Sequence, residues 1–222
     1  MEVWLPIYHE ICSDFGFSEE KDSESAKFLS SMISESSARS LNDVRASNIP
    51  SAAVLCGGGG TLEDDVSHIR DGDYIVAADG ATTALLEATL MPDVIVTDLD
   101  GRVEDQIDAN ARGSTVFVHA HGDNMAALRR WVDRFEGRVV GTCQGPPVQG
   151  VFNFGGFTDG DRAACIMHEL GVRRMSLAGF DLERPSEKSG RSPKVKSRKL
   201  CWAQRILSRL AEDGVEFTSV SH

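Results

Sequence analysis

The chain has 222 residues, of which 41% are hydrophobic and 26% are charged, and its formal net charge is −11. This length predicts one domain with an appendage or two small domains, and the composition excludes a chain that is disordered throughout. No apolar run approaches the roughly 18 residues that a membrane span needs, and the N-terminus lacks the features of a signal peptide, so we expect a cytoplasmic protein without a membrane partner.

The cysteine spacing and the charge distribution argue against several further classes of protein. The five cysteines are widely spaced and form no CxxC pair, which argues against a disulfide framework and a zinc site. Acidic residues dominate 57–123 and basic residues dominate 183–210. This asymmetry fits a metal–polyphosphate ligand, although an acidic protein with a basic surface helix would share it. A broad basic surface is lacking, so nucleic acid is not an expected partner.

Residues 1–48 are expected to form an N-terminal helical region. Apolar residues recur there near a 3.6-residue period, among them Trp4, Ile7 and Ile11. The segment FGFSEEKDSESA predicts a break followed by a second helix, with Ser23 or Ser25 as its cap. The apolar positions can either seal a homodimer or pack on the rest of the chain.

From residue 49 onward, strand and helix patterns alternate. The predicted strands lie at about 52–56, 74–79, 93–98, 115–120, 138–144, 173–180 and 215–220, and the predicted helices at about 62–69, 81–90, 125–135, 158–170 and 200–213. Strands that are apolar throughout indicate a parallel sheet covered on both faces. We therefore expect an α/β domain over 49–222, with an open, mostly parallel, Rossmann-like sheet and a mobile basic loop at about 183–199.

Carboxylates follow the ends of successive predicted strands. They are Asp79, Asp98, Asp100, Asp123 and Asp181. Because the carboxyl ends of parallel strands meet at one edge of a sheet, these side chains are expected to face one crevice. Crowded carboxylates repel each other unless a cation joins them, and hard oxygen ligands suit Mg²⁺ together with substrate phosphates. The sequence therefore predicts a metal-dependent site for phosphate chemistry.

Asp98 and Asp100 are the strongest metal candidates. They directly follow the strand VIVT, and residues two apart in an extended backbone point the same way. Asp79 can reach the same metal, contact a ribose hydroxyl or cap the next helix. Asp123 is a further carboxylate candidate, with His121 near phosphate or acting as a proton carrier.

His119 has two interpretations. It can join His121 in a functional site, or it can be a satisfied core histidine. Two imidazoles without further ligands are weak evidence for zinc.

A glycine turn, Gly58, Gly59 and Gly60, follows the first strand and precedes a helix. Glycines there let backbone amides approach a phosphate, but a tight structural turn has the same composition. Neither GxxxxGK[ST] nor strict GxGxxG spacing is present, so a P-loop is excluded.

The segment NFGGFTDGDR opens a later helix. Gly155 and Gly156 permit a close backbone approach to a nucleotide. Thr158 or Asp159 can cap the helix, and both are also candidate nucleotide contacts. Arg162 offers a planar fork for phosphate or carboxylate.

Basic residues lie in or beside the predicted loop; they are Lys194, Lys196, Arg198 and Lys199. Closure of the loop over a triphosphate would exclude water and balance charge, whereas a solvated charge run would show the same composition.

Five segments together carry a family resemblance: ADGAT (78–82), PDVIVTDLDG (92–101), VHAHGDN (118–124), FNFGGFTDGDRA (152–163) and LAGFD (177–181). They resemble the archaeal-type 6-hydroxymethyl-7,8-dihydropterin pyrophosphokinases, which are similar in structure to thiamin pyrophosphokinases. The resemblance covers nearly the whole chain, continues to a helix start at Lys199-Leu200, and departs at CGGGGTL, where GxGPSL is expected.

The resemblance implies Mg²⁺-dependent transfer of pyrophosphate from ATP to the pterin hydroxymethyl oxygen, giving AMP, in folate or methanopterin synthesis. Asn153, Thr158 and Asp181 are candidates for contacts to the pterin edge. Three alternatives stay open: a thiamin pyrophosphokinase-like enzyme with another acceptor, a sugar-transfer or flagellin-glycosylation factor, and a non-catalytic nucleotide-binding module.

Overall fold

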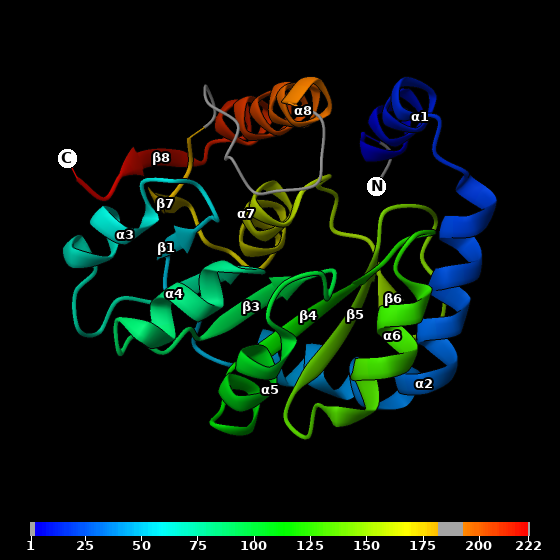
Figure 1. Ribbon diagram of the computed structural model, residues 1–222, viewed down its shortest axis with the longest axis horizontal. Coiled ribbons are helices and arrows are strands. Elements are labelled where there is room, and N and C mark those ends of the chain that lie inside the picture. Colours follow the sequence, from blue (N-terminus) through cyan, green and yellow to red (C-terminus); the bar gives the residue numbers. More distant parts are fainter. Residues whose placement is uncertain (1–2, 182–192, 222) are drawn as a thin grey trace.

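An eight-stranded, all-parallel sheet forms the centre of the computed structural model, which describes residues 3–181 and 193–221 (Figure 1). The expected open parallel sheet is thereby confirmed. The strand order is β6-β5-β4-β3-β2-β1-β7-β8. The strands are β1 (Ala52–Cys56), β2 (Ile75–Ala78), β3 (Val94–Thr97), β4 (Thr115–Ala120), β5 (Val139–Cys143), β6 (Val151–Phe152), β7 (Arg174–Ala178) and β8 (Glu216–Ser219).

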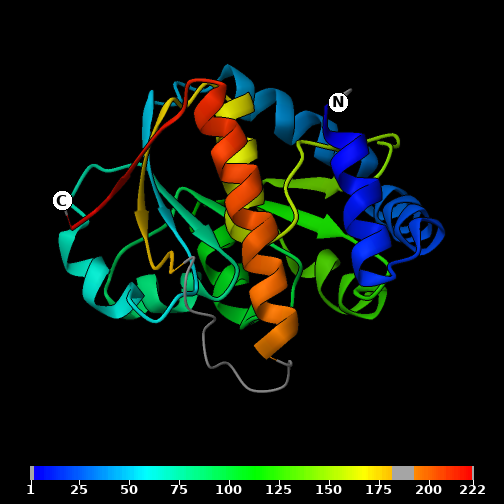
Figure 2. The same ribbon diagram turned by 90° about the horizontal axis from the view of Figure 1, so that it is seen from above.

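Helices cover both faces of this sheet. They are α1 (Trp4–Phe15), α2 (Glu19–Ala46), α3 (Leu62–Asp65), α4 (Ala81–Glu87), α5 (Val103–Ala111), α6 (Met125–Trp131), α7 (Asp159–Glu169) and α8 (Pro193–Glu212), with 3₁₀ turns η1 (Val66–His68) and η2 (Val132–Arg134). The helices α1, α7 and α8 share one apolar core with one face, and α3 to α6 share a second core with the other. In Figure 2, α8 lies across α7. Among the described helices, none is both long and apolar enough to cross a bilayer.

Two-sided coverage explains why the strands are apolar throughout. Every residue of β2, β3, β4 and β5 is buried, because successive side chains point into different cores. Only the edge strand β8 alternates between exposed and half-buried residues. All-parallel sheets with helices on both faces have this pattern.

The N-terminal helices pack on the sheet. Trp4, Ile7 and Ile11 are buried in the core that α1 shares with α7 and α8. Of the two roles predicted for them, the structure thus shows packing on the rest of the chain. The N-cap of α2 is Ser18, whose hydroxyl accepts a hydrogen bond from the Lys21 amide at 3.2 Å. The predicted caps Ser23 and Ser25 were wrong, since both lie within α2.

Three further elements differ from expectation. The helix α5 and the short strand β6 were not predicted; the sequence of α5, VEDQIDANA, has few apolar residues to reveal a helical period. Helix α8 begins at Pro193, a residue that suits a first helical turn, rather than near Lys199. The basic residues 194–199 are therefore helical, and residues 183–192 of the predicted loop lie outside the described residues.

Helix α2 packs closely on the turn before β6. The buried Ser37 hydroxyl donates to the Gly150 carbonyl at 2.5 Å and accepts a hydrogen bond from the Gly141 amide at 2.9 Å. Gly150 has φ of 69°, and a Cβ there would collide with the backbone of Ser34. Glycine is therefore required at this position by both conformation and space.

We expect Gly150→Ala to lower the free energy of unfolding by about 2–4 kcal/mol, because left-handed strain and overpacking add. Gly16→Ala is the matched control: Gly16 has the same φ of 69° but no atom within 4 Å of an added Cβ, so only the strain, about 1 kcal/mol, should appear. Denaturant unfolding measures both, and equal losses would contradict the close packing of α2.

Candidate active site

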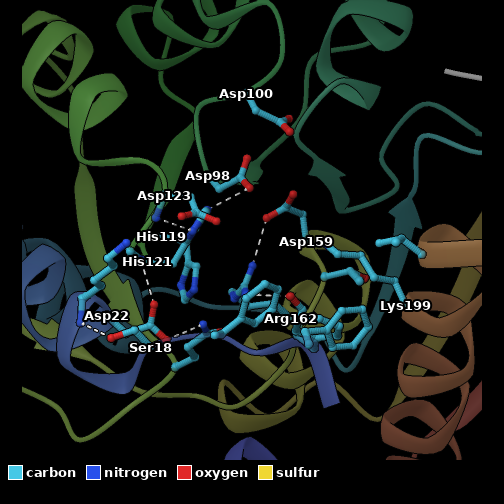
Figure 3. A pocket seen from close by; sticks show the side chains of 18 of the residues that line it. Ser18, Asp22, Asp98, Asp100, His119, His121, Asp123, Asp159, Arg162 and Lys199 are labelled. Atoms are coloured by element: carbon cyan, nitrogen blue, oxygen red, sulfur yellow. Dashed lines mark hydrogen bonds and ion pairs between the residues drawn. The ribbon is translucent and has the colours of Figure 1, made fainter. Parts of the chain in front are cut away.

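A cavity of about 600 Å³ lies at the carboxyl edge of the sheet (Figure 3). Its walls come from the segments after β3 and β4, the start of α7, the start of α8 and the corner between α1 and α2. This position agrees with the expectation that ligands bind outside the carboxyl ends of the strands.

Three of the predicted carboxylates converge at this edge. One oxygen each of Asp79, Asp98 and Asp100 lies within 4.8 Å of the others. The Oδ1 atom of Asp98 is buried and has no hydrogen-bond partner among the described residues. Clustered hard oxygen atoms with an unused acceptor fit a divalent cation such as Mg²⁺.

The convergence of Asp98 and Asp100 has a different cause from the expected one. Strand β3 ends at Thr97, and the buried Leu99 has φ of 67°, so a left-handed turn rather than an extended backbone brings the two carboxylates together. The Leu99 amide donates to the Thr97 hydroxyl at 2.9 Å. A left-handed residue other than glycine costs about 1–2 kcal/mol, and such strain is often found at functional sites.

Asp79 is fixed by three donors. Its Oδ1 accepts hydrogen bonds from the Thr97 hydroxyl at 2.7 Å, the Gln106 amide group at 3.0 Å and the Gly101 backbone at 3.3 Å. The N-cap of α4 is Gly80, without a side-chain cap bond, so Asp79 does not serve as the predicted helix cap. Its carboxylate is instead oriented toward the acidic cluster.

Asn124 joins the segments after β3 and β4. Its Nδ2 donates to the Asp98 carbonyl at 2.9 Å and to the His119 carbonyl at 2.6 Å. Its Oδ1 accepts a hydrogen bond from the His121 amide at 3.0 Å. This buried side chain therefore holds the acidic cluster and the histidine segment in register.

His121 contacts Asp98 directly, with 3.3 Å between its Nε2 and Oδ2 of the carboxylate. The Asp123 amide donates to Nδ1 of His121 at 3.3 Å, so in the neutral ring the proton lies on Nε2 and points at Asp98. Burial alone would raise the pKa of Asp98, but the hydrogen bond and charge of His121, with Arg162 and Lys199, hold that pKa below its usual value.

Asp159 is a fourth carboxylate beside the cluster. Figure 3 shows it pointing toward the same space as Asp98 and Asp100. Burial and then the negative charge of Asp98 raise the pKa of Asp159 well above its usual value, although Arg162, 3.0 Å away, opposes the shift. Asp123 lines the cavity but is exposed and is not part of the three-carboxylate group.

The start of α7 forms another wall. Thr158 is its N-cap, as predicted, and Asp161 accepts hydrogen bonds from the Thr158 amide and hydroxyl. The buried Arg162 donates from Nη1 to Asp159 and from Nη2 to the Phe157 carbonyl at 3.0 Å. Thr158, Asp159 and Arg162 line the cavity, and the guanidinium is largely engaged by the protein itself.

Other predicted residues do not line this cavity; they are Asp79, Gly58, Gly59, Gly60, Gly155, Gly156, Asn153 and Asp181. The Gly59 amide donates to the Gly179 carbonyl at 2.8 Å, so the glycine turn packs against the segment after β7. The Asn153 side chain donates to the carbonyls of Gln144 and Gly145, at 2.8 and 2.6 Å, and thereby fixes a loop.

The corner between α1 and α2 supplies residues that sequence reasoning missed; they are Phe15, Gly16, Phe17, Ser18, Lys21 and Asp22. Nothing in the charged stretch EEKDSES distinguishes Asp22 from its exposed neighbours. Yet Asp22 is buried and accepts hydrogen bonds from Tyr8 at 2.9 Å, Gln144 at 2.8 Å and the Gly122 amide at 2.7 Å. Burial, together with the Asp22 charge, raises the pKa of Tyr8 well above its usual value, so the phenol remains a donor.

Helices α1 and α8 meet beside the cavity. Arg198 pairs with Asp14 at 2.6 Å, and Arg205 pairs with Glu10 at 2.6 Å. The Trp202 indole also donates to Asp14 at 3.0 Å. These contacts join α8 to α1, and the predicted residue Lys199 lines the cavity from α8.

The parallel sheet and the carboxylate cluster at its edge define an open-sheet α/β protein with a candidate cation site. A family profile described as "6-hydroxymethylpterin diphosphokinase MptE-like" matches residues 9–187. The chain belongs to this family.

Two relatives cover most of the chain. A protein of Methanothermobacter thermautotrophicus is 41% identical over 96% of this chain and 96% of its own length, and one of Pyrococcus furiosus is 44% identical over 81% of this chain and 77% of its own. Both are named 6-hydroxymethyl-7,8-dihydropterin pyrophosphokinase. A crystal structure of thiamine pyrophosphokinase from Bacillus subtilis aligns with 75% of this chain and 58% of that one, at 14% identity and a TM-score of 0.40.

We expect Asp22→Ala to lower the free energy of unfolding by about 3 kcal/mol, because it leaves the buried donors of Tyr8 and Gln144 and the half-buried Gly122 amide without their acceptor. Glu24→Ala, at an exposed position of the same helix, should change it by less than about 0.5 kcal/mol. Guanidinium unfolding compares the two, and similar losses would show that Asp22 does not anchor the corner.

Proposed function

We propose that this protein transfers the terminal diphosphoryl group of ATP to 6-hydroxymethyl-7,8-dihydropterin, in the presence of Mg²⁺, as a step of folate or methanopterin synthesis. The observation that carries the proposal is the acidic cluster of Asp79, Asp98 and Asp100 at one end of a cavity with an aromatic wall, in a chain of the 6-hydroxymethylpterin diphosphokinase MptE-like family. The acceptor's identity is supported by the names of the two relatives.

In the proposed reaction, the pterin hydroxyl oxygen forms a bond to the β-phosphorus of ATP. The bond breaks between that phosphorus and the oxygen that it shares with the α-phosphorus. AMP leaves with the electron pair of this bond, and the hydroxyl proton is released. Mg²⁺ held by the acidic cluster would neutralise the charge on the phosphate oxygens. Catalysis of this kind consists mainly of positioning and charge stabilisation.

The chain's own residues supply the rest of the arrangement. Asp79, Asp98 and Asp100 would hold the cation, and His121 orients Asp98 through its Nε2 proton. Lys199, on the opposite wall, can contact the phosphates as a point charge. Asp159 restrains Arg162 beside the cluster.

Asp98→Asn and Asp100→Asn should each lower kcat by on the order of a hundredfold to a thousandfold, because each removes an anion that holds the cation in the transition state. The measurement is AMP release from ATP with 6-hydroxymethyl-7,8-dihydropterin. Asp71→Asn, at an exposed loop position, is the control and should keep the wild-type rate. Wild-type turnover in either cluster variant would refute the assignment of the acidic cluster.

Cation binding should also be visible without turnover. At a Mg²⁺ concentration of about 100 times its dissociation constant, we expect the melting temperature to rise by roughly 5–10 °C, since binding then stabilises the folded state by about 2.7 kcal/mol. EDTA should abolish both the shift and the activity. Asp98→Asn should lose the shift while Asp71→Asn keeps it, and an equal shift in both variants would place the cation elsewhere.

A further inference from the structure

His119 is a buried side chain with one unused polar atom at the cavity. It is 1% exposed and lines the cavity, and its Nε2 has no hydrogen-bond partner among the described residues. A buried polar atom without a partner lowers the stability of the fold, so a native site that keeps one has a reason to do so. The expectation of a fully satisfied core histidine is therefore met at only one of the two ring nitrogens.

The hydrogen bonds around Thr142 decide which nitrogen of His119 carries the proton. The Thr142 hydroxyl lies 3.2 Å from the Val118 carbonyl and 3.1 Å from His119 Nδ1. When it donates its single hydrogen to the carbonyl, it accepts a hydrogen bond from His119, and the ring proton lies on Nδ1. In the neutral ring, Nε2 is then an acceptor with a free lone pair.

The ring stays neutral in this environment. Burial, and then the positive charge of Arg162, lower the pKa of His119 well below its usual value. Arg162 also has an unused atom: its Nε, a donor, is buried without a partner among the described residues. His119 and Arg162, which line the cavity and which Figure 3 shows beside each other, thus carry a buried acceptor and a buried donor that no described residue uses.

A ligand that satisfies both atoms must offer a hydrogen-bond donor next to an acceptor. The lactam edge of a pterin ring, an N–H at N3 beside a carbonyl at C4, has this pattern. Phe15, Phe17 and Phe157 lie along the same cavity, with ring centroids 5.2–6.3 Å apart, and give it an apolar wall against which a flat ring can pack.

We infer that His119 is a substrate-binding residue that accepts, at Nε2, a hydrogen bond from the N3–H of the pterin lactam edge, with the Arg162 Nε–H directed to the adjacent carbonyl. This inference rests on the proposed function and adds the orientation of the acceptor. It places the ring edge deep in the cavity, beneath the acidic cluster. The hydroxymethyl group, on the far side of the bicyclic ring, then faces the phosphates.

Two substitutions of His119 separate binding from structure. His119→Asn places an amide near the Nδ1 position, where it can keep the bond to Thr142, but removes the acceptor at Nε2. His119→Gln reaches the Nε2 position with its amide oxygen but loses the bond to Thr142. We expect the Asn variant to raise the KM for the pterin roughly ten- to hundredfold with the KM for ATP within about twofold, and the Gln variant to keep the pterin KM within a few-fold.

A structural role for His119 predicts the opposite order. The Gln variant would then be the impaired one, and both substrates would be affected together with the melting temperature. An unchanged pterin KM in His119→Asn, with wild-type enzyme active in the same assay, would overturn the inference and leave the proposed function standing. Absence of AMP release by the wild-type enzyme with this pterin would refute the proposed function itself, and the inference with it.

A modified ligand tests directly whether His119 binds the lactam edge of the pterin ring. Binding of 6-hydroxymethylpterin and of its N3-methyl derivative can be compared through pterin fluorescence, for the wild-type protein and for His119→Asn. Methylation should weaken binding to the wild-type protein at least about tenfold and binding to the variant by much less, because the variant has already lost the acceptor. Equal penalties in the two proteins would show that His119 does not bind N3–H.

Discussion

The repulsion among clustered carboxylates is the constraint on which this site depends. Asp79, Asp98 and Asp100 converge within 4.8 Å, and Asp159 adds a fourth acid whose pKa is raised by burial and then by the charge of Asp98. Like charges at this distance separate unless covalent geometry and hydrogen bonds hold them or a cation neutralises them. The protein uses a rigid frame, since Asn124 ties the segment after β3 to that after β4 and three donors fix Asp79.

The frame is itself strained. Asp79 and Leu99 both have positive φ, 43° and 67°, although neither is glycine. Such conformations persist where the surroundings determine them, and here the buried Leu99 side chain and the Thr97 hydroxyl do so. Repulsion and the unpaired Asp98 oxygen act in the same direction as this strain, since each lowers the stability of the protein without a cation. A cation at the cluster would relieve the repulsion and satisfy the oxygen.

Much of the fold was predictable from apolar runs, because strands buried on both faces have a pattern that few other elements share. The acidic cluster was predictable from the same runs, since strand ends define one edge of the sheet. Asp22 and α5 were not, because a buried carboxylate and a polar helix resemble exposed segments until tertiary contacts are known. Asp159 was predicted as a nucleotide contact rather than a neighbour of Asp98, because the fold of α7 over β1, β2 and β3 leaves no trace in local sequence.

The meeting of α1 with α8 has a consequence for how the protein is made. Arg198 and Arg205 of α8 pair with acids of α1, and both helices contribute walls to the cavity. Contacts between residues almost two hundred positions apart close a very long loop. While the chain is still emerging from a ribosome, the wall that α8 contributes cannot form. The chamber is therefore enclosed only after this late helix has been synthesised and has docked on α1.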